Sequence, residues 1–236
     1  MSDELWKRAA VDLCFQVEYA PVDTVVWEHS SRVTRLADTI VSLQEISTGD
    51  VDNNALEVAA LYHDAGWVVQ VQSGRLLPQE IFLRPATDLL RELGADWTTE
   101  RLTDLVPEGV LNSAAQIIRQ VGNRQTNILE AQVLAEADNL DEIGPQAICL
   151  MIRKQQAEGR TLQNLIDTWE RRDQYNYWEA RIKDCFRFPS VRRLAEHRLE
   201  KMRRFIADLG ASLRLEDLRI LDDSLPSQSR ANKITP

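Results

Sequence analysis

The chain has 236 residues and a mass of 27.0 kDa, and its 44% hydrophobic content is enough to bury the core of one large domain or two small ones. Its 37 acidic residues outnumber the 28 basic ones, and the net charge of -9 argues against duplex nucleic acid or an anionic membrane as a partner. The three cysteines are widely spaced, which is not typical of a disulfide framework or a cysteine zinc site, and the first residues lack a signal-peptide pattern, so a cytoplasmic location is expected.

Apolar residues recur along the chain at spacings of three and four, which predicts helices throughout and an all-α fold. The predicted helices, in chain order, span residues 24–44, 54–66, 79–93, 110–121, 127–143, 145–158, 161–171, 175–186 and 190–209. The second of these is expected to end at Gly66, where a left-handed cap costs little. Loops are expected at 72–78, 94–99 and 121–126, where turn-forming residues gather.

No internal repeat divides the chain, and no linker rich in glycine, serine or proline separates two parts of it. Residues 1–222 are therefore predicted to form a single helical domain. Residues 223–236 have few apolar side chains to bury and are predicted to form a flexible tail. The pattern does not indicate an oligomeric state.

The chain has only three histidines, so a site that needs imidazole has few candidates. His29 follows Val26 by three residues and precedes Val33 by four, which places it on the apolar face of its predicted helix. His63 follows Ala59 by four residues and Ala60 by three, which places it on the apolar face of the next predicted helix. His197 lies at the flank of the last helix among basic residues and is predicted to be on the surface.

Two aspartates also fall on or beside apolar faces. Asp64 follows His63 directly, and Asp138 follows Leu134 by four residues. A carboxylate in such a place is costly unless it is paired or binds a metal. Two inward imidazoles and two inward carboxylates make a complete nitrogen and oxygen ligand set for one divalent ion.

Structural explanations stay open for each residue taken alone. A buried histidine is often a hydrogen-bonded core residue, a His-Asp pair can cap a helix, and an inward aspartate can pair with an arginine such as Arg153. Neighbouring side chains on a helix diverge by about 100°. His63 and Asp64 can therefore share an ion only if it lies over the edge between them.

Three segments resemble, in order and spacing, the motifs of the HD-domain superfamily, which is named for its His, His-Asp and Asp metal ligands; they read EHSSRVTRLADTI, LEVAALYHDAG and LAEADNLDEIG. The segment FPSVRRLAEHRLEKMRRFIADLG resembles the long C-terminal helix of the bacterial HD phosphohydrolase branch. The resemblance covers roughly residues 20–210 and implies a single-domain helical bundle of the HD type. Carried over by position, it implies that His29, His63, Asp64 and Asp138 ligate one metal ion.

The chain departs from parts of this family. Members with two metals have further histidines between the His-Asp pair and the last aspartate, whereas this chain has none from Ala65 to Ala137. A second histidine-ligated metal is therefore not expected. Deoxynucleotidase members carry a glutamate three residues after the aspartate of the pair, where this chain has Trp67, and the acidic pair of the guanosine-polyphosphate hydrolases is also missing. Neither of those two activities transfers to this chain.

The resemblance implies a hydrolase in which water bound to one divalent ion attacks a small phosphate ester, for instance a nucleotide. The ligand set suits Mn, Fe, Co, Ni or Mg and does not distinguish among them. Asp64 is expected to be catalytic as well as a ligand. Asp141, one helical turn after Asp138, is a candidate for orienting or deprotonating the water and equally for a capping or surface residue.

Arginine is the side chain expected to bind the phosphate. Arg32, one turn after His29, is the first candidate, and Arg124 and Arg153 are further ones. Two alternatives to an active enzyme stay open. The first is a catalytically inactive, metal- or nucleotide-binding regulatory module of the same fold, which Trp67 favours. The second is a purely structural helical domain whose inward histidines are core residues.

Overall fold

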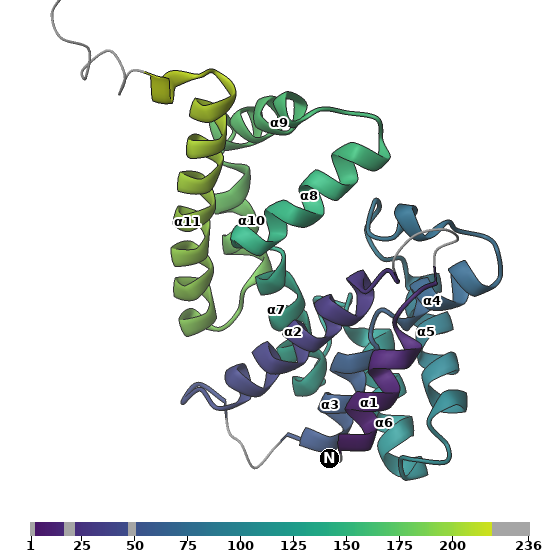
Figure 1. Ribbon diagram of the computed structural model, residues 1–236. Coiled ribbons are helices and arrows are strands. Elements are labelled where there is room, and N and C mark those ends of the chain that lie inside the picture. The colour runs from purple at the N-terminus through teal and green to yellow at the C-terminus, as the bar shows by residue number, and fades with distance from the viewer. Residues whose placement is uncertain (1–2, 17–21, 47–50, 219–236) are drawn as a thin grey trace, which may run out of the picture.

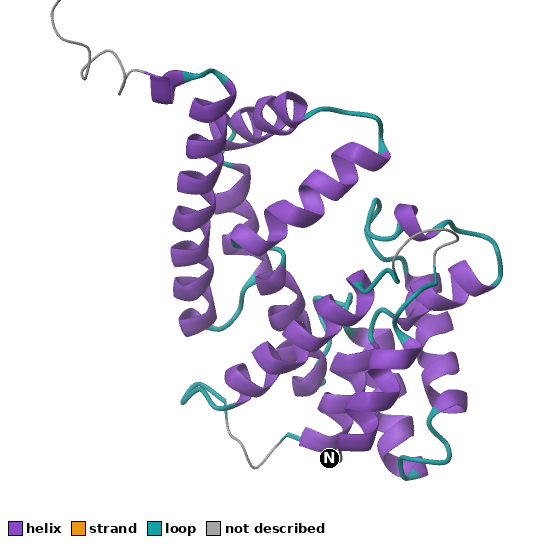
Figure 2. Cartoon of the chain, in the orientation of Figure 1, coloured by secondary structure: helices purple, strands orange, loops and turns teal. Residues whose placement is uncertain are grey.

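The computed structural model describes residues 3–16, 22–46 and 51–218, and the predicted tail at 223–236 lies outside these residues. Within them, Figure 2 shows helices joined by loops, and the one β-type contact is an isolated bridge between Phe15 and Asp23. The predicted all-α fold is confirmed. The α-helices are α1 (Asp3–Asp12), α2 (Val25–Val41), α3 (Asn53–Tyr62), α4 (Ala65–Gln72), α5 (Asp88–Arg101), α6 (Glu108–Gln120), α7 (Leu129–Asp141), α8 (Pro145–Ala157), α9 (Leu162–Gln174), α10 (Tyr177–Cys185) and α11 (Pro189–Leu213), with short 3-10 turns η2 (Pro78–Glu80) and η3 (Glu216–Leu218).

The most buried helix is α3, where every residue from Ala55 to Tyr62 except Glu57 is buried. Helices α1, α2, α5, α6 and α7 all contact it. Such a helix is apolar on all sides because it has neighbours on all sides. Helices α8 to α11, drawn green to yellow in Figure 1, form a second group that contacts the first, α1 to α7, through α7 and η2. The long helix α11 buries one stripe against α7, α8, α9 and α10.

Helix α1 was not among the predicted helices. A buried carboxylate holds it in place: Asp12 accepts hydrogen bonds from Tyr62 of α3 at 3.2 Å and from Arg101 of α5, whose Nη2 lies 2.7 Å away. Burial and the neighbouring Asp12 charge raise the pKa of Tyr62, so its hydroxyl stays protonated and donates. Ten residues with a short apolar stripe give a weak pattern, and these long-range contacts decide that the helix is stable.

The predicted helix end at Gly66 is wrong. Helix α3 already ends at Tyr62, and Gly66 lies inside α4 without a left-handed backbone. A Cβ atom at Gly66 would lie 2.0 Å from the carbonyl oxygen of Leu90, so glycine is required there for α5 to approach α4. The close packing of two helices, and not a cap, explains this glycine.

The region from 79 to 99 also differs from the prediction. Only η2 and a loop precede Asp88, because Pro85 is incompatible with a helix that continues through residue 84. Helix α5 begins after Thr87, whose hydroxyl caps it by accepting from the Leu90 amide, and it includes the predicted loop at 94–99. Among the described residues, no helix is both long and apolar enough to cross a membrane.

Candidate metal centre

The four predicted ligands come from three places among helices α2 to α7, and the fold brings them together. His29 lies on α2, Asp138 lies on α7, and His63 and Asp64 occupy the break between α3 and α4. His63 directly follows Tyr62, the last residue of α3, and Asp64 directly precedes Ala65, the first residue of α4. The backbone of Asp64 (φ -103°, ψ 12°) interrupts the helix there, which allows two consecutive side chains to converge although they would diverge on one continuous helix.

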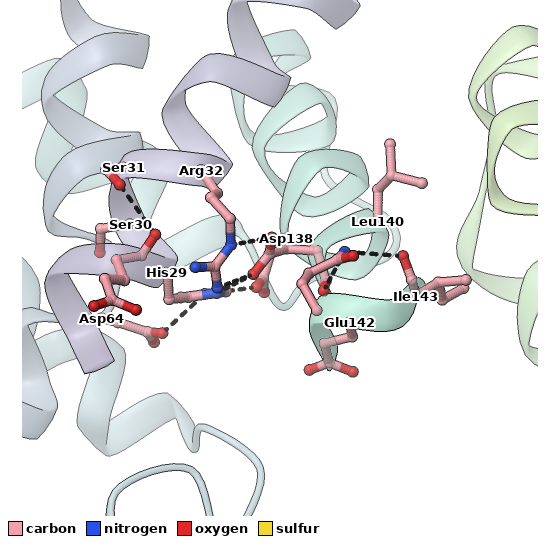
Figure 3. Close-up of polar contacts among 12 residues, drawn as sticks. His29, Ser30, Ser31, Arg32, Asp64, Asp138, Leu140, Glu142 and Ile143 are labelled. Atoms are coloured by element: carbon pink, nitrogen blue, oxygen red, sulfur yellow. Dashed lines mark hydrogen bonds and ion pairs between the residues drawn. The ribbon is translucent and has the colours of Figure 1, made fainter. Parts of the chain in front are cut away.

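The ligand atoms lie close to a common point. The Nε2 atom of His29 is 3.2 Å from Nε2 of His63, 3.4 Å from Oδ2 of Asp64 and 3.2 Å from Oδ1 of Asp138. The Nε2 atom of His63 is 3.4 Å from Asp64 and 3.8 Å from Asp138. Figure 3 shows the His29 side chain between Asp64 and Asp138. His29, His63 and Asp64 form a group that could hold a metal ion, and Asp138 lies beside it.

The second nitrogen of each ring shows that this donor set suits a cation. Nδ1 of His29 donates to Oδ2 of Asp141 at 2.8 Å, and Nδ1 of His63 donates to the Ala60 carbonyl at 2.9 Å. In the neutral rings both Nε2 atoms then carry lone pairs, and these face each other and two carboxylates. Only protons or a metal ion can make such an arrangement favourable.

Electrostatics at the site follow from this crowding. Burial by itself lowers the pKa of His29, but hydrogen bonds to Asp138, Asp141 and Asp64 outweigh it and raise that pKa well above the usual range. The pKa of His63 is raised as well, because the charges of Asp64 and Asp138 outweigh its burial. Burial acts to raise the pKa of Asp138, and the two imidazoles lower it nonetheless. A divalent ion would take the place of the imidazole protons.

Asp141 does not have the position expected for a residue that activates water. Its side chain is 2% exposed, and both oxygens are occupied: Arg32 donates from Nε at 2.8 Å and from Nη2 at 2.9 Å, and His29 donates from Nδ1. Asp141 therefore stands behind His29, away from the open side of the site, and it is neither a cap nor a surface residue. Arg32 holds Asp141 in this position and does not line the cavity beside the ligands, and its phosphate-binding role stays a prediction.

A cavity of about 610 Å³ opens beside the ligands, and His29, Asp64 and Asp138 form part of its wall. The His63 side chain is 2% exposed, whereas that of Asp138 is 34% exposed. The site is thus closed by protein on one side and open to the cavity on the other. Trp67 and Phe82 line the wall next to His29, with ring centroids of Phe82 and His29 5.2 Å apart.

The cavity wall is rich in cations although the whole chain is acidic. It includes Lys154 and six arginines, namely Arg84, Arg91, Arg124, Arg172, Arg181 and Arg187. Of the predicted phosphate-binding residues, Arg124 is on this wall. Arg153 is not, because it pairs with Asp23 and donates to the Pro78 carbonyl at 2.9 Å. Arg91, Lys154, Arg172, Arg181 and Arg187 were missed, because their spacing in the sequence is the same as that of ordinary surface residues.

The remaining prediction concerns His197, and three aromatic residues lie near the cavity. His197 is exposed, as predicted. Trp169 and Trp178 are buried, with ring centroids 4.9 Å apart, and so belong to the core of the second group. Tyr177 is 39% exposed on the cavity wall, and the Arg172 guanidinium lies 5.1 Å from its ring centroid.

Comparisons with known proteins agree with this fold. The crystal structure of a predicted HD superfamily hydrolase from an uncultured Thermotogales bacterium is 20% identical and has a TM-score of 0.53 over 89% of this chain and 91% of that chain. Bacillus subtilis YpgQ is 21% identical, with a TM-score of 0.55 over 89% and 94% of the two chains. Its structure in complex with ADP has 23% identity and a TM-score of 0.56 over 90% and 97%.

No curated protein gives a significant sequence match. The family model of the HD domain, however, matches residues 26–143, which is half of the chain and contains all four predicted ligands. The chain belongs to the HD-domain superfamily.

Proposed function

We propose that this protein is a metal-dependent phosphohydrolase that holds one divalent ion at His29, His63, Asp64 and Asp138 and acts on a small phosphate ester of the nucleotide class. One observation carries the proposal. Two imidazole Nε2 atoms and two carboxylates converge at the wall of a cavity of about 610 Å³ that also carries seven cationic side chains. A cavity of this size suits a small-molecule ligand.

Each part of the site has a task in this proposal. A divalent ion, when bound, polarises a phosphoryl oxygen and makes water a good nucleophile near neutral pH. Asp141 holds the His29 ring with its Nε2 atom toward the ligand group. The partly exposed Asp138 leaves that group open to the cavity. The apolar rings of Trp67 and Phe82 exclude water from the wall beside His29.

Two features favour a nucleotide among phosphate esters. The seven cations of the wall exceed what one phosphate group needs, and Tyr177 offers an exposed ring within the same cavity on which a base can stack. A structurally similar protein, YpgQ of Bacillus subtilis, forms a complex with ADP. These features support the nucleotide class without selecting a base.

The test has two stages. Protein purified without chelator is analysed for metals, and a stoichiometric divalent ion is expected. The protein is then screened against nucleotides and simple phosphate esters with Mn²⁺, Co²⁺, Ni²⁺ and Mg²⁺. Turnover is expected to be lost in Asp64→Ala and retained in Asp208→Ala, which changes an exposed aspartate on α11. Full activity in Asp64→Ala would reject the assigned site.

The alternative is an inactive metal- or nucleotide-binding module of the same fold. The burial of Trp67 favours it, because this side chain is 5% exposed and places an indole where some relatives have a carboxylate. The two candidates differ in one outcome. A module binds the ion and a nucleotide in calorimetry but turns over none of the esters in the screen.

A further inference from the structure

One arginine on the cavity wall, Arg91, is partly buried and makes a single ion pair among the described residues. The side chain of Arg91 is only 19% exposed, and its one ion pair joins Nη1 to Oδ1 of Asp88 at 2.9 Å. The Asp88 side chain is 98% exposed, so solvent weakens this pair. The Nε atom of Arg91 is buried and has no hydrogen-bond partner among the described residues. A guanidinium removed from water in this way is costly unless another partner compensates it.

The position of the guanidinium depends on Gly122. A Cβ atom at Gly122 would lie 2.5 Å from Cζ, 2.6 Å from Nη1 and 2.8 Å from Nη2 of Arg91. Gly122 does not have a left-handed backbone, so its missing side chain matters for space and not for conformation. The flat face of the guanidinium thus lies against the bare backbone of the loop between α6 and α7.

Helix packing brings Arg91 to this loop. The residue before it, Leu90, is the one whose carbonyl contacts Gly66 next to the His-Asp pair. Arg91 and Gly122 both line the cavity that Asp64 and Asp138 also line. The close contact of α4 with α5 therefore fixes an arginine in the same cavity as the candidate ligands.

We infer that Arg91, held against Gly122, is a preformed binding site for an oxyanion of the ligand, specifically a phosphate group. The inference rests on the proposed function in taking that anion to be a phosphate. A guanidinium presents paired N–H groups that match two phosphate oxygens, and a side chain already held in place loses little entropy when it binds.

The other cations of the wall do not combine these features. Arg181 already pairs with Glu142, and Arg187 donates to the Arg124 carbonyl. Arg84, Arg124 and Arg172 are exposed, so they would have to be ordered by the ligand, and Lys154 has an ammonium group that lacks the paired N–H groups of a guanidinium. Among these cations, only Arg91 is both largely buried and placed where a side chain at position 122 would be, so that its position requires Gly122.

The test measures ligand binding and not only activity. Binding of ADP, and of inorganic pyrophosphate as a probe without a base, is measured by calorimetry in the presence of Mn²⁺. The variants are Arg91→Met, Arg91→Lys, Gly122→Ala and the double variant Arg91→Met with Gly122→Ala. Arg75→Met is the control, because Arg75 is exposed and outside the cavity wall. Thermal unfolding and Mn²⁺ affinity are measured for each variant.

Arg91→Met is expected to weaken both probes by roughly 10- to 100-fold, as for a hydrogen bond to a charged group, with Mn²⁺ affinity unchanged. Arg91→Lys should recover only part of this loss. Gly122→Ala should weaken both probes in the wild-type background and add nothing in the Arg91→Met background, because it acts by displacing the guanidinium. Arg75→Met should bind as the wild type does.

The inference is overturned if Arg91→Met binds both probes within about twofold of wild type, or if wild type binds neither probe. It also fails if Gly122→Ala has the same effect with and without Arg91. The two proposals can fail separately. If the probes bind through Arg91 but no ester is turned over, the hydrolase proposal is rejected and the phosphate site is kept. If an ester is turned over and Arg91→Met does not change its KM, the phosphate site is rejected and the hydrolase proposal is kept.

Discussion

The two candidate histidine ligands are oriented by different partners. His63 donates to a backbone carbonyl, which is neutral, whereas His29 donates to Asp141, a carboxylate that Arg32 holds through two hydrogen bonds. A charged partner makes an imidazole a stronger ligand as well as fixing its ring. The Arg32–Asp141 pair therefore acts on the metal site through His29.

Replacing Asp141 with asparagine tests this role. The amide of asparagine keeps an oxygen that accepts from the His29 N–H group, but it loses the negative charge and one of the two hydrogen bonds from Arg32. Metal affinity should fall by roughly 10- to 100-fold, with the helical content unchanged. Mn²⁺ titration by calorimetry and circular dichroism measure the two quantities. The control is Asp208→Asn, and an Asp141→Asn protein that binds Mn²⁺ as tightly as wild type would contradict this role.

Glu136 is a buried carboxylate two residues before Asp138 on α7. It accepts a hydrogen bond from the Arg187 amide, but its Oε2 atom has no partner among the described residues. Burial raises its pKa to about 7, although backbone donors at Arg187 and Phe188 act in the opposite direction. The fold therefore favours the protonated form.

The sign of the resulting pH effect is clear. Because the folded-state pKa lies above the ordinary value of 4.5, the proton on Glu136 contributes stability that is complete below about pH 4.5 and is lost as the pH rises through about 7. Glu136→Gln mimics the protonated form. The variant should match wild type at low pH and exceed it by a few kcal/mol above pH 7, at roughly 1.4 kcal/mol per pKa unit.

Urea unfolding of chelator-treated protein between pH 5 and pH 8 measures this difference. Glu196→Gln, which changes an exposed glutamate on α11, should show no such trend. A constant difference between Glu136→Gln and wild type across this range would show that Glu136 ionises normally.

At the scale of elements, the contact between α4 and α5 is the tightest backbone approach near the site. Gly66 lies against the Leu90 carbonyl, and a Cβ atom at Gly94 would lie 2.9 Å from the Gly66 nitrogen. This contact places α5, and with it Arg91, next to the helix that follows the His-Asp pair. Stability and site geometry therefore depend on the same two glycines.

Gly66→Ala should separate these helices. The added methyl group meets backbone and not a movable side chain, so the free energy of unfolding should fall by about 3 kcal/mol or more. The matched control is Gly109→Ala in the first turn of α6, where an added Cβ atom meets nothing within 4 Å. That change should be neutral or stabilise by up to roughly 1 kcal/mol. Urea unfolding of both variants is the measurement, and equal effects would refute the packing argument.

At the scale of the molecule, the site links metal binding to folding and to pH. The net charge of -9 does not prevent a cationic cavity, because the cations that line it come from α5, from α8 to α10 and from loops that meet only in the fold. The raised pKa values of His29 and His63 mean that the metal-free folded protein keeps imidazole protons to a higher pH than the unfolded chain does. Their contribution to stability is complete below the ordinary pKa of 6.5 and is lost as the pH rises through the folded-state values.

A metal ion must displace these protons, so it should stabilise the protein more at pH 8 than at pH 6. With Mn²⁺ at one fixed concentration, equal to 100 times its Kd at pH 8, stabilisation of about 2.7 kcal/mol at that pH corresponds to a rise in Tm of about 5–10 °C for a chain of this size. Differential scanning calorimetry of chelator-treated protein with and without Mn²⁺ measures it. A rise that is larger at pH 6 would contradict the assignment of the histidines.

Local periodicity was enough to predict most of the helices and the inward faces of His29 and His63, because one face of a helix repeats every three to four residues whatever surrounds it. The family was predicted separately, from the resemblance of three segments to its motifs. It failed where non-local contacts decide: α1 depends on Asp12 meeting Tyr62 and Arg101, and Gly66 looked like a helix end.

The roles of the charged residues were decided only by the tertiary structure. A helical pattern says that Asp141 and Arg32 lie one turn from the ligands, but not that they pair with each other behind His29. In the same way, nothing in the sequence indicates that Arg91 on α5 contacts Gly122 after α6. Their contact exists because α4 and α5 pack at a glycine, and the position of a side chain relative to another helix is a property of packing and not of periodicity.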